Sequence, residues 1–290
     1  ADPELIVTDI IAMPGVTNTN VTTHMVTTAE NRADCMAIID LPSYKPDSEG
    51  QVTTSDRLGA TVDSVVNTLK ARSFNSSYGA TYYPWVQIRD TISNQNVWVP
   101  PSVVALGALS YGQASQELWF APAGFTRGGL SEGRGGVPVL AVAQRLNSRE
   151  RDLLYEANIN PIAQFPAEGI VIFGQKTLQV TPSALDRINV RRLMIYLKRE
   201  ISTIASTLLF DQNVSSTWSR FKSQVEPFLE SVKSRLGITE YRLILDSTTT
   251  TPDLVDRNIL YAKIYLRPAR AIEFIAIDFN ISSSGASFAD

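Results

Sequence analysis

Hydrophobic residues in the second half of the chain recur at intervals of three and four, and this period predicts two long helices. The first covers residues 186–209, with its apolar stripe at Val190, Leu193, Met194, Leu197, Ile201, Ile204, Ala205 and Leu208. The second covers residues 216–236, and Gly237 follows it at the position where helices commonly end. Pro227 lies inside the second stretch, and we expect it to kink or divide that helix near Glu226, because proline removes a backbone donor.

After these helices the hydrophobic period changes from 3.6 to 2, which is typical of strands. Strands are predicted at residues 241–245, 259–266 and 271–281. In the middle one, Ile264 and its alternate neighbours fall on one side, while Lys263 and Tyr265 fall on the other.

The first half of the chain is less regular. Strands are expected at residues 5–11, 37–41, 98–99 and 137–142, and helices at residues 55–71 and after Ser148. Long connections are indicated at Pro100, Pro101, Gly107 and the glycines of residues 124–136.

Prolines at 161 and 166 punctuate the chain near its middle and suggest a domain boundary there. The prediction is an α+β fold with two mixed α/β domains, covering residues 1–160 and 161–290. The second domain would pack two long helices on a small, mostly antiparallel sheet. The chain begins without Met or a signal-peptide pattern, so we expect an N-terminal part of a longer protein to precede it.

Composition narrows the function classes. The 290 residues are 44% hydrophobic and 19% charged, which is typical of a globular protein. Residues 1–160 carry 11 Lys and Arg against 16 Asp and Glu, and residues 161–290 carry 15 against 13, giving the overall net charge of -3. Neither half has the basic excess of a nucleic-acid binder, and no apolar run approaches the length of a membrane span.

Candidate catalytic and metal-binding residues are few. His24 and Cys35 are each the sole residue of their type, so a multi-His or multi-Cys zinc site is excluded and no cofactor is expected. His24, with neighbouring threonines and aspartates, is better explained as a surface or strand-partner residue than as a catalytic base. Cys35 is expected to be a small core residue. The acidic group Asp246, Asp253 and Asp256 does not fit an EF-hand loop.

A glycine-rich loop is the strongest enzymatic candidate. Gly128 and Gly133 have the spacing of a phosphate-binding loop, but Arg134 and Gly135 stand where that loop has Lys and a hydroxyl residue. The sequence YYPW at residues 82–85 could form a sugar-binding platform, and a packed extended strand is the favoured alternative.

Several segments, in order along the chain, resemble the contractile tail sheath family of bacteriophages. The stretches that carry this resemblance are AIIDLP at 37–42, YYPWV at 82–86, VPPS at 99–102, WFAPA at 119–123, NINP at 158–161, GIVIFGQKTL at 169–178, INVRRL at 188–193 and PARAIEF at 268–274. Phe173, Gln175 and Lys176 depart from the residues most common in the family's pattern.

The resemblance implies a viral structural protein of a myovirus tail, not an enzyme, with residues 1–160 as the sheath's middle domain and 161–290 as its conserved, tube-proximal inner domain. It implies self-assembly of hexameric rings into a helical sheath around the tail tube, and contraction that drives the tube through the host cell envelope for genome ejection. Expected partners are further copies, the tail tube protein, and baseplate and tail terminator proteins, with no nucleic acid and no membrane insertion. The protein would be made in the host cytoplasm and reside in the virion.

Two sets of residues are candidates for assembly contacts. Strand exchange between subunits, a form of β-augmentation, is predicted at residues 271–281, through Ile272, Phe274, Ile275, Ile277, Phe279 and Ile281. A face that contacts an acidic tube surface is predicted on the second long helix, through Arg220, Lys222, Lys233 and Arg235. A wholly intramolecular strand and an ordinary solvated helix face are the respective alternatives.

Two other functions remain open from the sequence alone. One is a soluble nucleotide-binding hydrolase that uses the loop from Gly128 to Gly135. The other is a tube or baseplate component, which would assemble without contracting.

Overall fold

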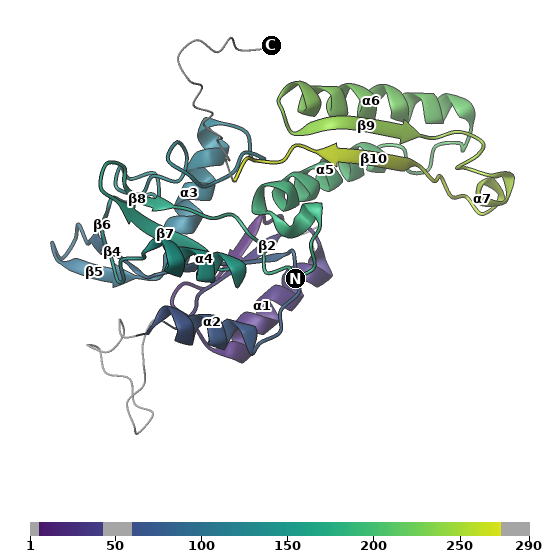
Figure 1. Ribbon diagram of the computed structural model, residues 1–290. Coiled ribbons are helices and arrows are strands. Elements are labelled where there is room, and N and C mark those ends of the chain that lie inside the picture. The colour runs from purple at the N-terminus through teal and green to yellow at the C-terminus, as the bar shows by residue number, and fades with distance from the viewer. Residues whose placement is uncertain (1–5, 43–59, 274–290) are drawn as a thin grey trace, which may run out of the picture.

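The computed structural model describes residues 6–42 and 60–273, which form seven helices and ten strands (Figure 1). The helices in chain order are α1 (Thr19–Arg32), α2 (Val62–Lys70), α3 (Pro101–Ser115), α4 (Ser148–Glu156), α5 (Ile188–Ser206), α6 (Ser215–Ser234) and α7 (Pro252–Asp256). The strands are β1 (Ile10–Ala12), β2 (Met36–Ile39), β3 (Gly79–Tyr83), β4 (Val86–Arg89), β5 (Asn96–Val99), β6 (Val139–Val142), β7 (Asn160–Phe165), β8 (Gly169–Ile172), β9 (Ile238–Ile244) and β10 (Lys263–Pro268).

The central sheet has five strands in the order β1-β2-β3-β7-β8. The pairs from β1 to β7 are parallel, and β7 and β8 form an antiparallel hairpin. All four residues of β2 are buried, as expected for a strand covered on both faces. Ala37 and Ile39 face a core that includes residues of α1, α2 and α4, whereas Met36 and Ile38 face a core built with α3.

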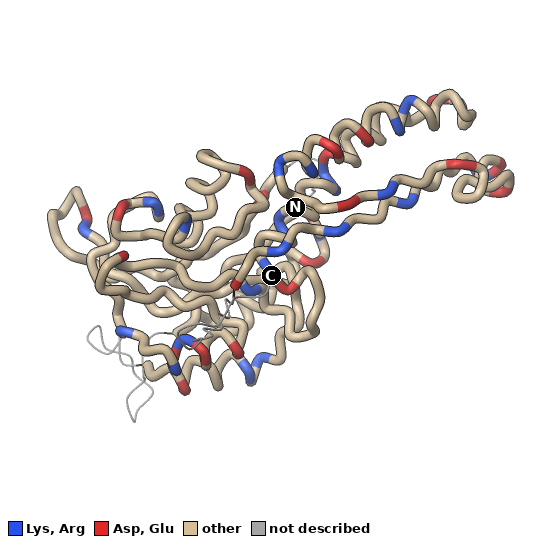
Figure 2. Tube along the Cα trace, turned by 45° about the horizontal axis from the view of Figure 1, so that its top comes forward, with Lys and Arg blue, Asp and Glu red and all other residues tan. Residues whose placement is uncertain are grey.

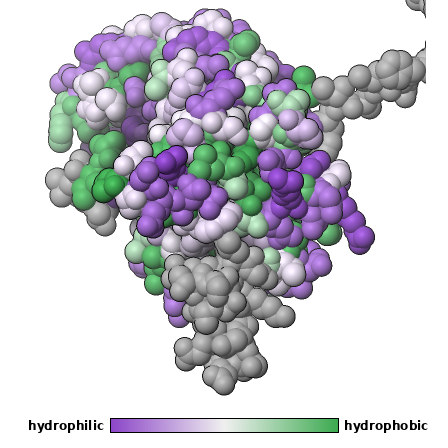
Figure 3. Space-filling model, turned by 90° about the vertical axis from the view of Figure 1, so that its left-hand side faces the viewer, coloured by the Kyte–Doolittle hydropathy of each residue, from purple (hydrophilic) through white to green (hydrophobic). Residues whose placement is uncertain are grey.

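A second sheet, in the order β5-β4-β6, packs beside the first, and α3 contributes to the core that both share. We call residues 6–42 and 60–178, with both sheets and α1 to α4, the main body. On one side of the main body, hydrophobic residues occur in several separate groups among hydrophilic ones (Figure 3). Scattered exposed apolar residues of this kind are ordinary for a protein surface.

The C-terminal part of the described chain projects from the main body (Figure 1). Here α5 and α6 pack with β9 and β10 around a third core, which includes Leu197, Val225 and Leu229. Helix α5 belongs to two cores at once, because Ile188 and Ile195 join the core beneath α3 while Leu193 and Leu197 join the third. The helix therefore ties the projection to the main body.

Trp119 makes a second connection between these parts. Its indole Nε1–H donates to the carbonyl oxygen of Arg235 at 2.9 Å, and its own carbonyl accepts from Asn189 at 3.3 Å. Tyr196 of α5 packs against its ring, with 6.0 Å between centroids.

The predicted fold class is confirmed: the molecule is a mixed α+β protein, and its C-terminal part has two long helices on a small antiparallel sheet. The proposed division at residues 160 and 161 stays a prediction. The sheet gives a reason to move it later, because β7 and β8 follow residue 159 yet pair with β3 of the first half.

One local expectation was wrong, and one alternative of a second is ruled out. Pro100, Pro101 and Gly107 do not mark a long connection, because α3 begins at Pro101, a first-turn position where proline's missing N–H costs no hydrogen bond. Pro227 does not divide the second long helix, since α6 runs through it from Ser215 to Ser234.

Candidate functional site

The two strands β9 and β10 form an antiparallel sheet of only two strands, which we call the ribbon. Each strand of the ribbon has an outer edge with no strand beside it among residues 6–42 and 60–273. Backbone N–H and C=O groups on such edges form a ready template for a further strand. A two-stranded sheet is also marginal by itself and needs packing against other elements.

The ribbon has an apolar inner face and a polar outer face. Leu243, Ile264 and Leu266 pack against the core of α5 and α6. On the outer face, Arg242, Lys263 and Tyr265 are exposed, and Arg242 lies directly opposite Tyr265 in the register. Figure 2 shows basic residues on both strands. Side chains on this face leave the strand edges free for backbone pairing.

The predicted strand-exchange segment lies almost wholly outside the described residues. Only Ile272 of its six candidates is described; it is 82% exposed and lies outside the assigned strands. Phe274, Ile275, Ile277, Phe279 and Ile281 fall among residues 274–290, which the structure does not describe. The strand at 271–281 therefore stays a prediction.

The four basic candidates on α6 do not form one cluster. Arg220 pairs with Asp211, and Lys233 pairs with Glu230 at 3.6 Å. Because eleven residues separate Lys222 from Lys233, a rise of 1.5 Å per residue places them about 16 Å apart along the helix.

Arg235 is also engaged within the chain. Its guanidinium pairs with Glu117 at 3.0 Å and lies over the ring of Trp119, 5.2 Å from the centroid. Contact of these four residues with a tube stays a prediction. The exposed basic residues Arg242 and Lys263 of the ribbon were not among the candidates, although the alternation of residues 259–266 had placed Lys263 opposite the apolar side.

The glycine-rich loop lacks the geometry of a phosphate-binding loop. Gly128 N–H donates to the Gly124 carbonyl at 2.7 Å, and Leu130 N–H donates to the Ile170 carbonyl at 2.7 Å, so these amides have protein partners. Arg134 pairs with Glu132 at 2.9 Å. The next element is β6, whereas a phosphate-binding loop leads into a helix whose N-terminus faces the phosphate. The loop is part of the main body's packing.

The remaining chemical candidates also have structural explanations. His24 is exposed on α1. Cys35 is fully buried, and burial raises the pKa of its thiol to about 11, so the thiolate is scarce at neutral pH. The segment at residues 82–85 ends strand β3, and Tyr82 is buried, which confirms the packed strand.

Two searches of the described residues found nothing further. They hold no group of three or more His, Cys, Asp or Glu side chains that could bind a metal ion. None of their helices has both the length and the apolar character needed to cross a membrane.

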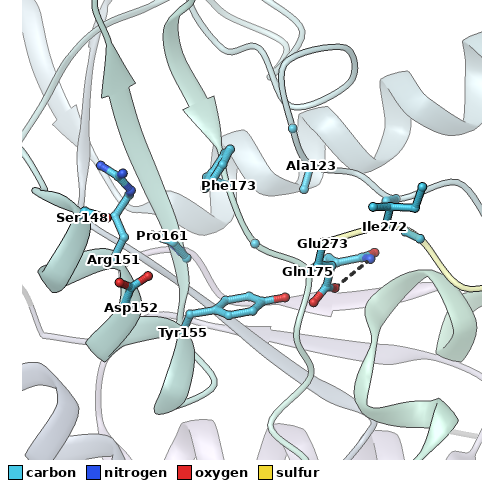
Figure 4. A pocket seen from close by; sticks show the side chains of 14 residues that line it. Ala123, Ser148, Arg151, Asp152, Tyr155, Pro161, Phe173, Gln175, Ile272 and Glu273 are labelled. Atoms are coloured by element: carbon cyan, nitrogen blue, oxygen red, sulfur yellow. Dashed lines mark hydrogen bonds between the residues drawn. The ribbon is translucent and has the colours of Figure 1, made fainter. Parts of the chain in front are cut away.

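A cavity of about 290 Å³ lies where the chain returns from the ribbon to the main body (Figure 4). Arg151, Tyr155 and Phe173 line it from the main body, and Ile272 and Glu273 line it from the last described stretch.

Comparisons with known proteins agree along the whole chain. A family model described as the phage tail sheath protein central domain matches residues 7–178, and one described as the phage tail sheath C-terminal domain matches residues 180–282. The tail sheath protein of Enterobacteria phage T4 is 31% identical over 280 residues, covering 94% of this chain and 40% of that protein. The tail sheath protein of Vibrio phage KVP40 is 38% identical over 201 residues, covering 69% of this chain and 29% of that protein. The chain thus spans less than half the length of these relatives.

Solved structures share the fold at low sequence identity. The contracted sheath complex of the extracellular contractile injection system PVC has a TM-score of 0.73 and 22% identity, covering 97% of this chain and 73% of that chain. The contracted helical sheath of the anti-feeding prophage has a TM-score of 0.71 and 20% identity, covering 94% of this chain and 69% of that chain.

Proposed function

Because this chain belongs to the phage tail sheath family, we propose that it is the polymerising part of a contractile sheath subunit, joined to its neighbours at the ribbon. The observation that carries this proposal is that, within the described part of the chain, β9 and β10 each have an outer edge with no neighbouring strand. A neighbour's extended segment can add to such an edge through backbone hydrogen bonds, which demand little of the side chains.

The rest of the proposal concerns the whole protein. Copies form stacked hexameric rings around the tail tube, with baseplate and tail terminator proteins at the two ends, and the assembly resides in the virion after synthesis in the host cytoplasm. Contraction is passage from an extended lattice to one of lower free energy, and it drives the tube through the host envelope. Such a transition needs no nucleotide, because the free energy is stored when the subunits assemble.

A ladder of backbone bonds suits this motion. Five or six bonds at roughly 0.5–1.5 kcal/mol each hold two subunits together. The bonds persist while the folded domains rotate, provided that the connecting segments bend.

Disulfide cross-linking tests the strand exchange. Cys35 is buried, so introduced cysteines dominate oxidation. Asp278 alternates with the apolar residues of the predicted strand and so shares the polar outer face with Tyr265 and Arg242. In the full-length sheath protein, Asp278→Cys combined with Tyr265→Cys on β10 or Arg242→Cys on β9 is expected to give a ladder of covalent multimers on a non-reducing gel. Strand-paired cysteines come within the short Cβ separation that a disulfide requires.

The matched control combines Asp278→Cys with Ile92→Cys, at an exposed site in the main body between β4 and β5. It should remain monomeric on the same gel. A species that migrates as a cross-linked monomer would show that residue 278 pairs within its own chain, and the proposal would fail.

A further inference from the structure

The chain crosses from the ribbon back to the main body over residues 269–273. Ala269 N–H donates to the carbonyl oxygen of Gly237 at 3.0 Å, beside the start of β9. Four residues later, Glu273 points inward with its side chain 16% exposed, while its neighbour Ile272 points outward. Figure 4 shows the Glu273 carboxylate beside Gln175 and on the same side of the cavity as the Tyr155 hydroxyl.

The Glu273 carboxylate is held by donors from separate parts of the fold. Arg187, just before α5, donates from Nε to Oε1 at 2.6 Å and from Nη2 to Oε2 at 2.8 Å. Gln175, which follows β8, donates from Nε2 to Oε1 at 3.3 Å. Tyr155 of α4 also hydrogen-bonds to this carboxylate. A two-point arginine pair is both strong and directional.

Electrostatics keep this carboxylate charged. Burial by itself would raise the pKa of Glu273, but the hydrogen bonds from Arg187 and Tyr155 outweigh it, and the pKa is lowered. Burial raises the pKa of Tyr155, so its hydroxyl remains a donor. Lys176 and Asp186 are the other charged groups that act on this cluster.

We infer that Glu273 is a positioning residue for intersubunit exchange. Its carboxylate, clamped by Arg187, holds the chain against the main body at the point from which residues 274–290 leave for a neighbouring copy. This inference rests on the proposed exchange of strands. At about 3.4 Å per residue, residues 274–290 span at most about 58 Å when extended. A fixed origin limits which neighbour lies within that reach.

The clamp also decides where tension on the segment is borne. Without it, a pull on residue 274 would act on β10, which is paired only with β9. With it, the pull passes through Arg187 to the start of α5 and through Gln175 and Tyr155 to the main body. Breaking a half-buried ion pair leaves an uncompensated charge, so the clamp resists opening more than an exposed pair does.

Trypsin provides a direct reporter in this sequence. Arg270 is the last cationic residue of the printed sequence, so cleavage after it releases residues 271–290 together within one peptide. Arg267 precedes Pro268, a bond that trypsin spares. In the full-length protein, Glu273→Gln is expected to speed release of this peptide roughly tenfold, because local opening exposes the bond to the protease.

Two variants make the test specific. Glu240→Gln removes the exposed pair with Arg267 at 2.7 Å, close to the same bond, and should change the release rate less than about twofold. Arg187→Gln removes the other side of the pair without adding a trypsin site; it should speed release by a similar factor, and combining it with Glu273→Gln should add little. Each variant is digested at the same interval below its own Tm, so that differences in global stability do not affect the release rate.

Cross-link yield then separates clamping from positioning. Glu273→Gln in the Asp278→Cys, Tyr265→Cys protein should reduce the multimer ladder several-fold. Unchanged peptide release would overturn the clamp, and faster release with an undiminished ladder would overturn its positioning role. A parent protein that forms no ladder at all would instead refute the strand exchange, while the release rates would still report on the clamp.

Discussion

At the scale of single residues, Asp40 shows how one buried carboxylate organises the main body. Its Oδ2 accepts from Gly15 N–H at 2.9 Å and from Ser102 Oγ at 2.7 Å, and its Oδ1 accepts from Ser102 N–H at 3.1 Å. Ser102 lies in the first turn of α3, whose N-cap residue Pro100 offers no side-chain acceptor. Asp40, which directly follows β2, therefore supplies the cap and places a negative charge at the positive end of the helix.

Replacing Asp40 with Asn should lower the free energy of unfolding by about 1–3 kcal/mol, because the amide nitrogen cannot accept the bonds made by Oδ2. Asp90 is the matched control: it accepts from Ile92 N–H, Ser93 N–H and Ser93 Oγ, but in an exposed turn. Asp90→Asn should cost no more than about 0.5 kcal/mol. Urea unfolding of the two variants measures the difference, and equal losses would show that burial adds nothing to the Asp40 cap.

At the scale of elements, the hydrophobic period predicted those helices whose formation depends mainly on burying an apolar face. The apolar stripe was read correctly for α6 and for the C-terminal part of α5, where one face is buried, whereas residues 188–193 at the start of α5 are buried on every side. Helix α1 was not predicted, since it is rich in threonine and its buried residues are only Thr22, Met25, Val26 and Ala29. Its end depends on the left-handed residue Ala33, which carries no sequence signal of the kind that glycine gives.

The candidate site was less accessible to the sequence than the helices were. The alternation of residues 259–266 indicated a strand, and β10 occupies its second half. Whether a further strand lies beside β10 depends on which other segments pack nearby; among the residues that the structure describes, β9 is its one partner. The clamp joins Glu273 to Arg187, which lies 86 positions earlier in the chain, and no local sequence pattern indicates such a contact.

Helix α3 offers a paired test within one element. A Cβ at Gly107 would collide with the carbonyl of Gly135, so Gly107→Ala should destabilise the protein by about 1–3 kcal/mol through forced displacement of the loop. A Cβ at Gly112 would meet nothing within 4 Å, so Gly112→Ala should stabilise the protein by roughly 0.4–1 kcal/mol, the helix-propensity gain of alanine over glycine. Thermal unfolding distinguishes the two, and a stabilised Gly107→Ala variant would contradict the close approach of the loop.

At the scale of the whole molecule, the fold divides into a well-covered main body and a ribbon with unfilled edges. Strand β2 has β1 and β3 on its two sides and helices over its faces, whereas β9 and β10 have each other and one helical layer. Local opening is easiest where buried contacts and paired backbone groups are fewest. The part proposed to join neighbours is thus also the part that gains most from being joined.

Hydrogen exchange makes this argument measurable. In the unassembled protein, amides of β9 and β10 should exchange at least about tenfold faster than those of β2. Amides that point away from the partner strand of the ribbon have no ladder partner among the described residues, and amides that pair β9 with β10 open with little loss of buried contacts. In the assembled polymer the ribbon amides should become protected by at least about tenfold, since added strands fill both edges. Strand β5 serves as the internal control: it is also an edge strand, beside β4, but it belongs to the main body and should exchange at the same rate in both states. Protection that rose equally in β5 and the ribbon would indicate a general exclusion of water on assembly, and an unprotected ribbon would mean that subunits are joined elsewhere.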